Sequence, residues 1–375
     1  MKIGITCYPT FGGSGAVATQ LGRALADAGH TVHFISSSLP YKLRYHSHPR
    51  IFFHEVEQVN YPLFEDHSPY ILLLASKMAE IAKSERLDIL HVHYAIPHAL
   101  AAHTACQVLG RRRPRIVTTL HGTDVTLIGA LASLKDLTRY SIRKSDGITA
   151  VSEYLKRKTA EVFGIRGNLR VIPNFFSRHE FNPKLRPCPC FKKKSRCEKA
   201  IIHISNFRKV KRIPDVITVF KGIADAMSAR LILVGDGPEM CTAREMLTRF
   251  RLLDRTEFLG LRYNVAPILR HADLMLHPSD HESFGVSPLE ALACGVPVIA
   301  TRGSGLSEVV ADGQNGLLSA PGDTKKMISD ALSLLSDHRR HTQFSRHAAE
   351  WALENFEADR VVPRYVSCYR EVLGR

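Results

Sequence analysis

The stretch Ser279-Asp-His-Glu-Ser-Phe-Gly-Val-Ser-Pro-Leu-Glu-Ala-Leu-Ala-Cys-Gly295 decides how the rest of the chain is interpreted. The apolar run 274–276 before it predicts a short buried parallel strand, and apolar residues after it recur at helical spacing. The intervening loop therefore lies at the carboxyl end of a strand, the edge where open α/β sheets bind ligands. It leads from one carboxylate, Glu282, to a second, Glu290, eight positions later.

Each glutamate also has a structural interpretation. Ser287-Pro-Leu-Glu290 fits a capping box with proline at the first helical position, so Glu290 would cap a helix. Glu282 has no such role, because it lies in a loop with Gly285 three residues on, and an exposed glutamate is its default interpretation. Ligand binding by both carboxylates is the functional alternative.

The whole string resembles the E-x7-E signature of retaining nucleotide-sugar glycosyltransferases of the GT-B fold, the group that contains sucrose and glycogen synthases. The match comprises Glu282-Ser-Phe-Gly285, seven residues between the glutamates, and Ala291-Leu-Ala-Cys-Gly-Val-Pro-Val-Ile299. In that group the first glutamate holds the transferred sugar and the second holds the ribose hydroxyls. The resemblance implies that Glu282 is catalytic and that the donor is bound by Ser283, Phe284, Gly285 and Glu290.

Length and composition predict a soluble α/β enzyme of two or three domains. The chain has 375 residues, of which 45% are hydrophobic and 23% charged. It has no run of about 18 apolar residues, and Met1-Lys2 leads directly into a strand pattern, so we expect a cytoplasmic protein. Eight scattered cysteines suit a reducing compartment, although Cys188, Cys190 and Cys197 leave a metal site open.

The net charge of +15 is partly local. Residues 184–199 contain seven Lys and Arg residues against one acid, Glu198, and so contribute +6. We interpret them as part of a solvated linker. Only Phe191 interleaves with the charges, which argues against nucleic-acid binding. Peripheral contact with anionic lipid stays open, as does a homodimer.

Two Rossmann-like halves are predicted. Strand and helix patterns alternate through residues 1–173, break in a Pro- and Lys-rich linker at 174–199, and resume through 200–355. The helical tail from Thr324 has an expected break near Phe356, after which one apolar face is formed by Val361, Val362, Tyr365 and Tyr369. The resemblance implies a GT-B architecture, with an acceptor domain and a donor domain facing a cleft and residues 356–375 returning to the first domain.

A glycine-rich loop, Phe11-Gly-Gly-Ser-Gly15, follows the first strand. Its glycines allow close backbone approach, and the following helix offers free N–H groups to an anion. Read as Gly13-x-Gly15-x-x-Ala18, it also fits a dinucleotide fingerprint, so an NAD-dependent oxidoreductase is an alternative. That fingerprint expects an acid near the end of strand two, where the chain has serines at 36–38. In the resembled group this loop faces the donor diphosphate and the acceptor, which implicates Gly13, Ser14 and Gly15.

Three histidines occur at the ends of two predicted strands. The strand 115–121 ends in His121-Gly-Thr-Asp124, and by the resemblance His121 contacts the donor sugar. For His91 and His93 we expect one core-facing and one surface residue, and no third metal ligand is evident.

The basic run Ser205-Asn-Phe-Arg-Lys-Val-Lys-Arg212 follows the first strand of the second half. A solvated turn is the ordinary interpretation, but the resembled group places an Arg and a Lys here against the donor diphosphate. Arg208 and Lys211 are therefore expected to neutralise the leaving group. No two aspartates in the sequence are separated by one residue, so the D-x-D metal motif is absent and we expect metal-independent chemistry without a cofactor.

Further strings, at 4–10, 118–126, 205–212 and 233–239, are similar to the branch of this group that transfers N-acetylglucosamine from a UDP donor to L-malate in bacillithiol synthesis. Of these, 118–126 and 205–212 are much narrower than the general signature of the group. Departures are Ser304-Gly-Leu-Ser-Glu308 in the Gly-Gly-x-Pro-Glu turn and Lys42 where an arginine is usual. A dicarboxylate needs cations or N–H donors, and the expected acceptor residues at strand ends are Lys42, Tyr94, Thr119 and Thr123.

The implied reaction is retaining. A front-face route is expected, in which the departing phosphate oxygen takes the acceptor's proton after domain closure. A transferase acting on a lipid or cell-envelope polysaccharide, and a non-catalytic basic binding protein, are the further alternatives.

Overall fold

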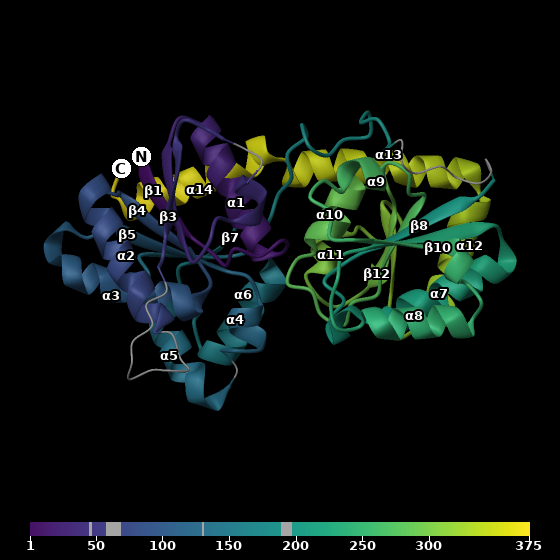
Figure 1. The fold of residues 1–375 in the computed structure, drawn as a ribbon, viewed down its shortest axis with the longest axis horizontal. Coiled ribbons are helices and arrows are strands. Elements are labelled where there is room, and N and C mark those ends of the chain that lie inside the picture. Colours follow the sequence, from purple (N-terminus) through teal and green to yellow (C-terminus); the bar gives the residue numbers. More distant parts are fainter. Residues whose placement is uncertain (45–46, 58–68, 130, 189–196) are drawn as a thin grey trace. The chain divides into compact units, whose positions relative to one another are not determined.

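The computed structural model describes residues 1–44, 47–57, 69–129, 131–188 and 197–375. The chain divides into two compact units, Met1–Asn174 with Asp359–Arg375 and Phe175–Ala358. Each unit is built around one parallel sheet with helices on its faces (Figure 1). The two doubly wound sheets expected for the GT-B fold are thereby confirmed.

In the described part of the first unit, seven parallel strands form one sheet. Their order is β3 (Ile51–Glu55), β2 (Thr31–Ser36), β1 (Lys2–Thr6), β4 (Ile89–His93), β5 (Arg115–Leu120), β6 (Gly147–Ala150) and β7 (Leu169–Val171). The helices are α1 (Ser14–Asp27), α2 (Tyr70–Glu85), α3 (Leu100–Leu109), α4 (Thr123–Thr126), α5 (Ala132–Arg143), α6 (Glu153–Phe163) and α14 (Ala358–Val372), with short turns η1 (Tyr41–Leu43), η3 (Ala95–Ala99) and η4 (Gly110–Arg112).

Alternation along β4 assigns the two faces of this sheet. Leu90 and Val92 belong to the apolar cluster that contains α2 and α3. His91 points to the opposite face, because successive strand residues do so, and there Tyr369 of α14 contacts it. The C-terminal helix thus belongs to the first unit, and its expected apolar face, Val361, Val362, Tyr365 and Tyr369, is buried.

In the described part of the second unit, six parallel strands form the other sheet. Their order is β10 (Thr256–Gly260), β9 (Ala229–Val234), β8 (Lys199–Ile204), β11 (Leu274–His277), β12 (Val298–Thr301) and β13 (Gly316–Ser319). The helices are α7 (Ile213–Ala226), α8 (Met240–Arg249), α9 (Ala266–Leu269), α10 (Val286–Ala293), α11 (Leu306–Val309), α12 (Thr324–Ser336) and α13 (His338–Phe356), with turns η5 (Lys209–Lys211) and η6 (Leu253–Arg255).

The structure excludes the capping-box interpretation of Ser287 and Glu290. Helix α10 begins two residues earlier than the box requires, at Val286, with Gly285 as its N-cap at φ +107°. Glycine reaches this conformation without strain, and the chain enters the helix directly from it. Pro288 is then the third helical residue, and Glu290 lies in the second turn, too far along to cap the helix.

The interpretation of residues 184–199 as solvated throughout is also wrong at its end. Glu198 is buried and its carboxylate lies 3.5 Å from Nε of Arg230, and Lys199 already opens β8. Residues 175–188 belong to the second unit, where the Phe176 amide donates to the Phe356 carbonyl. Cys190 of the cysteine cluster lies outside the described residues.

Candidate functional site

In the second unit the predicted residues gather where β8 and β11 end. The two strands are hydrogen-bonded neighbours in parallel register, so the loops that follow them share one edge of the sheet. The ammonium group of Lys211 forms an ion pair with the Glu282 carboxylate, and both side chains are mostly buried. Two of the four residues expected to be catalytic are thus in direct contact.

His277, for which no role was predicted from the sequence, completes this cluster. Nε2 of His277, the last residue of β11, donates to Oε1 of Glu282 at 2.9 Å. Behind it lies His203, whose ring stacks on that of His277 at 5.9 Å between centroids. The only sequence signal was a histidine at the end of an apolar strand, which does not reveal its partner.

These contacts set the charge state of Glu282. Burial alone would raise the pKa of the Glu282 carboxyl, but the Lys211 charge and the His277 hydrogen bond outweigh it. The pKa of this carboxyl therefore lies well below its usual range. Glu282 is an anion that accepts hydrogen bonds at neutral pH.

Two glycines after β9 fix the basic loop that carries Lys211. A Cβ on Gly235 would lie 1.8 Å from the Ser205 carbonyl oxygen, and one on Gly237 would lie 2.0 Å from that of Asn206. Both glycines also have positive φ. The string Leu233–Glu239, noted in the sequence, thus packs against the basic loop 205–212 through close backbone contacts.

Arg212 ties the basic loop to the loop after β11. Its Nη1 donates to Oδ1 of Asp280 at 2.9 Å and its Nε to Oδ2 of Asp215 at 2.6 Å. The Asp280 amide also donates to the Val210 carbonyl. Arg208 precedes η5 and is exposed, so its guanidinium is accessible to an anion from solvent.

The residues predicted to hold the donor along α10 have different surroundings. Phe284 is buried and packs edge to face on Phe356, which leaves its backbone, not its ring, for a ligand. A Cβ on Gly305 would lie 2.3 Å from the Ser283 carbonyl oxygen, so the altered turn at 304–308 still packs closely on this loop. Glu290 is buried within the helix.

In the first unit, the glycine loop leads into α1 with Gly13 as the N-cap. The Ser14 hydroxyl donates to the Tyr94 hydroxyl at 2.9 Å. Gly15 lies so close to the Tyr8 carbonyl that a Cβ would be 2.5 Å from its oxygen. The structure thus brings Ser14, predicted to bind the donor, together with Tyr94, predicted to bind the acceptor.

Tyr94 has an unusual backbone. Its φ is +93°, a conformation that bulky residues rarely adopt and that is concentrated at functional sites. Burial raises the pKa of its hydroxyl to about 12, so the group stays protonated and can donate a hydrogen bond.

His121 lies beside Tyr94, with 5.4 Å between the ring centroids. Its Nε2 is 2.8 Å from Nδ1 of His93. Burial lowers the pKa of His121 to about 3, with a smaller contribution from His98, so its imidazole is neutral at pH 7.

Asp124 holds the backbone around this histidine. Its carboxylate accepts the amide N–H groups of Ala95, His121 and Gly122 at 2.9 to 3.2 Å. No role for Asp124 was predicted from the sequence. Its place in the first turn of α4, directly after His121-Gly-Thr, is the signal that could have identified it, because an acidic side chain there can reach back to the N–H groups before the helix.

The remaining residues of the acceptor prediction divide into two groups. Lys42 lies in η1, and the ring of the neighbouring Tyr41 packs on Phe11 of the glycine loop at 4.3 Å. Thr123 is exposed at the start of α4. Thr119, by contrast, is fully buried, and its hydroxyl lies 2.7 Å from both the His91 ring and the Thr149 hydroxyl. Its side chain is therefore engaged inside the unit.

The expectation that one of His91 and His93 would lie at the surface is wrong, since both are fully buried. Residues two apart on a strand share a face, and α14 covers this one. Among the described residues no group of three or more His, Cys, Asp or Glu side chains could hold a metal ion.

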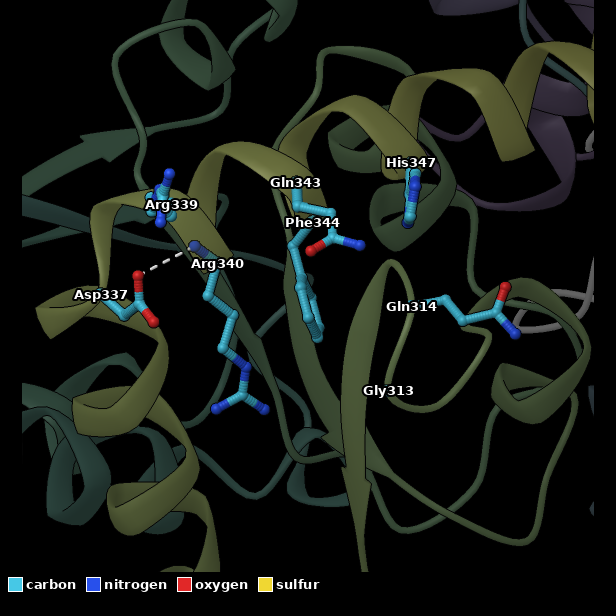
Figure 2. Close-up of a pocket in the computed structure, with 8 residues that line it drawn as sticks. All are labelled: Gly313, Gln314, Asp337, Arg339, Arg340, Gln343, Phe344 and His347. Atoms are coloured by element: carbon cyan, nitrogen blue, oxygen red, sulfur yellow. Dashed lines mark hydrogen bonds between the residues drawn. The ribbon is translucent and has the colours of Figure 1, made fainter.

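A pocket of about 680 Å³ lies elsewhere in the second unit, around the start of α13 (Figure 2). Arg339, Arg340 and His347 line it together with polar groups, and the Arg340 amide donates to Asp337 there. None of the predicted site residues lines it.

Comparison with protein families matches both halves of the chain. Residues 11–179 match the model "Glycosyltransferase Family 4", and residues 191–351 match "Glycosyl transferases group 1". The N-acetyl-alpha-D-glucosaminyl L-malate synthase of Bacillus anthracis is 47% identical over 100% of this chain and 97% of its own length.

Solved structures share the fold. Anabaena Alr3699/HepE, in complex with UDP and glucose, superposes with a TM-score of 0.80 at 20% identity, covering 98% of both chains. The sucrose-phosphate synthase of Thermosynechococcus elongatus superposes with a TM-score of 0.79 at 20% identity, covering 100% of this chain and 99% of its own.

Proposed function

The chain belongs to the group 1 glycosyltransferases, and from that membership we propose that it transfers N-acetylglucosamine from UDP-N-acetylglucosamine to the hydroxyl of L-malate. The observation that carries the proposal is the 47% identity, over the whole chain, to a relative named for that product. The ion pair of Lys211 with Glu282 supplies the matching chemistry, a cation and a sugar-binding carboxylate side by side.

Arg208 and Lys211 bind the donor diphosphate in this proposal. As the bond from the sugar to the phosphate breaks, negative charge develops on the departing oxygen, and fixed cations stabilise it. Arg208 is exposed, so its side chain can adjust to the ligand. Lys211 is already held in place by its ion pair with Glu282. These two charges perform the role that a metal ion has in other transferases, and the proposed reaction is independent of divalent metal.

Glu282 binds the transferred sugar as a hydrogen-bond acceptor. A carboxyl whose pKa lies well below its usual range is a weak base, so it is poorly suited to take the acceptor's proton. The departing phosphate oxygen is then the base for the malate hydroxyl. Attack from the face that the leaving group vacates retains the anomeric configuration.

The acceptor is held by residues of the first unit. L-Malate carries two carboxylates, which need cations or N–H and O–H donors. Lys42 provides the charge, and the protonated Tyr94 hydroxyl, which accepts from Ser14, provides a donor together with the glycine-loop amides. The ring contact of Tyr41 with Phe11 places the turn of Lys42 beside that loop. Thr123 completes the proposed set from the start of α4.

The test is UDP release by the purified protein from UDP-N-acetylglucosamine, with L-malate, D-malate, succinate or glycerol as acceptor. We expect rapid release with L-malate alone, since succinate lacks the hydroxyl and D-malate presents it on the wrong side. If UDP is not released with L-malate but is released with a lipid or an oligosaccharide, the protein is instead a cell-envelope transferase. A melting-temperature response to NAD but not to UDP would indicate an oxidoreductase.

A further inference from the structure

The contact between His93 and His121 has a direction that the rest of the molecule determines. We infer that His93 is a positioning residue that donates its Nδ1–H to Nε2 of His121 and so fixes the proton of His121 on Nδ1. His121 is then presented to the sugar as a hydrogen-bond donor. The inference deepens the proposed function and rests on it for the identity of the ligand.

Two other buried histidines show whether a ring nitrogen without a partner carries a proton in this protein. Nδ1 of His98 faces the His93 carbonyl, which only accepts, so His98 carries its proton there. Nε2 of His277 faces the ionised Glu282, so that nitrogen carries the proton. In both rings the other nitrogen is buried without a partner, and in both it is the lone pair, not an N–H. An unpartnered buried N–H is the rarer and costlier arrangement in proteins.

His93 presents the same choice. It is fully buried, its Nε2 has no partner, and its Nδ1 lies 2.8 Å from Nε2 of His121. A proton on Nε2 would leave an N–H without an acceptor in the interior. A proton on Nδ1 leaves only a lone pair there and makes the hydrogen bond to His121, so the structure assigns the proton to Nδ1.

The surroundings of His93 prevent its ring from turning away. It is stacked between His91, with 4.6 Å between centroids, and His121, at 5.0 Å. Its backbone carbonyl is engaged by His98. A ring flip would remove Nδ1 from His121 and leave both partners unsatisfied.

The consequence for His121 follows from its neutrality. A neutral imidazole whose Nε2 accepts a hydrogen bond must carry its proton on Nδ1. Nδ1 of His121 makes no hydrogen bond with any residue in the described ranges, and the side chain is partly exposed. A sugar oxygen is the acceptor that this N–H would meet, and the same arrangement excludes a role for His121 as a general base through Nδ1.

The direct test is nitrogen NMR on the wild-type protein labelled with ¹⁵N-histidine, because the two neutral tautomers and the imidazolium have different ¹⁵N shifts. His121→Asn identifies the signals of His121 by their loss. At pH 7 we expect neutral His121 with a proton on Nδ1 and none on Nε2, and the same for His93. A proton on Nε2 of His121, or an imidazolium, would overturn the inference.

The kinetic test compares two buried histidines of the same sheet. His93→Leu should lower kcat about 10- to 100-fold, by analogy with metal-bound histidines that lose the partner that orients them. His33→Leu is the matched control, because His33 is also buried and contacts a second histidine, His54, through Nδ1 and Nε2 at 3.0 Å. It touches no proposed site residue, so its kcat should be unchanged.

His93→Asn should restore most of the rate, since its side-chain amide nitrogen occupies the position of Nδ1. Equal rates for His93→Leu and His33→Leu would sink the inference. Absence of any UDP release by the wild type would refute the proposed function instead. The NMR assignment of the tautomer needs no activity, so the two failures are distinguishable.

Discussion

In the proposed reaction, Glu282 is the residue on which the chemistry depends most. Glu282→Gln keeps the shape but removes the charge that holds Lys211 and accepts from His277. We predict normal folding, retained UDP binding and a loss of at least about 10²-fold in kcat, because the carboxylate matters most when positive charge develops on the sugar. UDP-release kinetics and a melting curve measure both. Near-wild-type turnover would remove Glu282 from the site.

The two cations proposed to bind the diphosphate can be tested with a neighbour as control. Arg208→Ala should lower the transfer rate at least about 10²-fold, the scale seen for loss of an electrostatic stabiliser. Lys209→Ala changes an exposed cation in the same turn that the proposal leaves without a role. Equal losses of transfer rate in Arg208→Ala and Lys209→Ala would mean that only the general positive charge of the loop matters.

At this scale the sequence predicted single residues but not their partners. Glu282 and Lys211 were found from motifs, yet the ion pair between them spans two loops that only strand order brings together. No sequence motif indicated a role for His277 or a contact between His93 and His121. Thr119 was placed at the right strand end, but the face of the sheet it occupies directs its hydroxyl inward.

Helix α10 carries the next prediction. Gly285 caps this helix, so Glu290 has no capping role. Ribose binding is then the interpretation of Glu290 that is left to test. Glu290→Gln should leave the melting temperature nearly unchanged and weaken UDP binding about tenfold, as expected when a charged acceptor for the ribose hydroxyls is lost. Calorimetric titration with UDP measures the affinity. An unaltered affinity would exclude the ribose contact.

Elements with a strong apolar period were predictable, and others were missed. The alternation of strands and helices in both halves was predicted, as was the break near Phe356, where α13 ends. Strands β3 and β13 and helix α2 were overlooked. Strand β3 lies at a sheet edge and is only half-buried, so its pattern is weak. Helix α2 does show helical spacing in Leu74, Met78 and Ile81, a signal that was present but not used.

At the scale of the whole molecule, several of the described histidines are buried and neutral. Burial lowers the pKa of His33 and His98 to about 4 and that of His91 and His203 to about 3. Their folded pKa values lie below the unfolded value of about 6.5, so their contribution to stability is present above that pH and is lost as the pH falls. As the pH falls, the unfolded chain therefore binds protons on these histidines that the folded chain does not bind.

We therefore predict a steep loss of stability between pH 6.5 and 5, before most carboxyl groups titrate. Each such histidine lowers the unfolding free energy by about 1.4 kcal/mol per pH unit in that window. Asp124 acts in the opposite sense, because burial raises its pKa to about 6. Urea unfolding at a series of pH values measures the slope, and His33→Leu should reduce it by about one proton. A flat profile would contradict the account.

The two-unit architecture was predictable because strand and helix patterns restart after a break rich in proline and lysine. In the described part of the chain no helix is long and apolar enough to cross a membrane. A homodimer and a peripheral contact with anionic lipid stay predictions.

The most direct measurement of the central claim is the anomeric configuration of the product formed from UDP-N-acetylglucosamine, labelled with ¹³C at the anomeric carbon, and L-malate in the presence of EDTA. The account predicts one α-linked N-acetylglucosaminyl malate, formed in step with UDP, at a rate that EDTA does not change. A β-linked product, free N-acetylglucosamine in place of a malate adduct, or a reaction abolished by EDTA and restored by Mg²⁺ would contradict it.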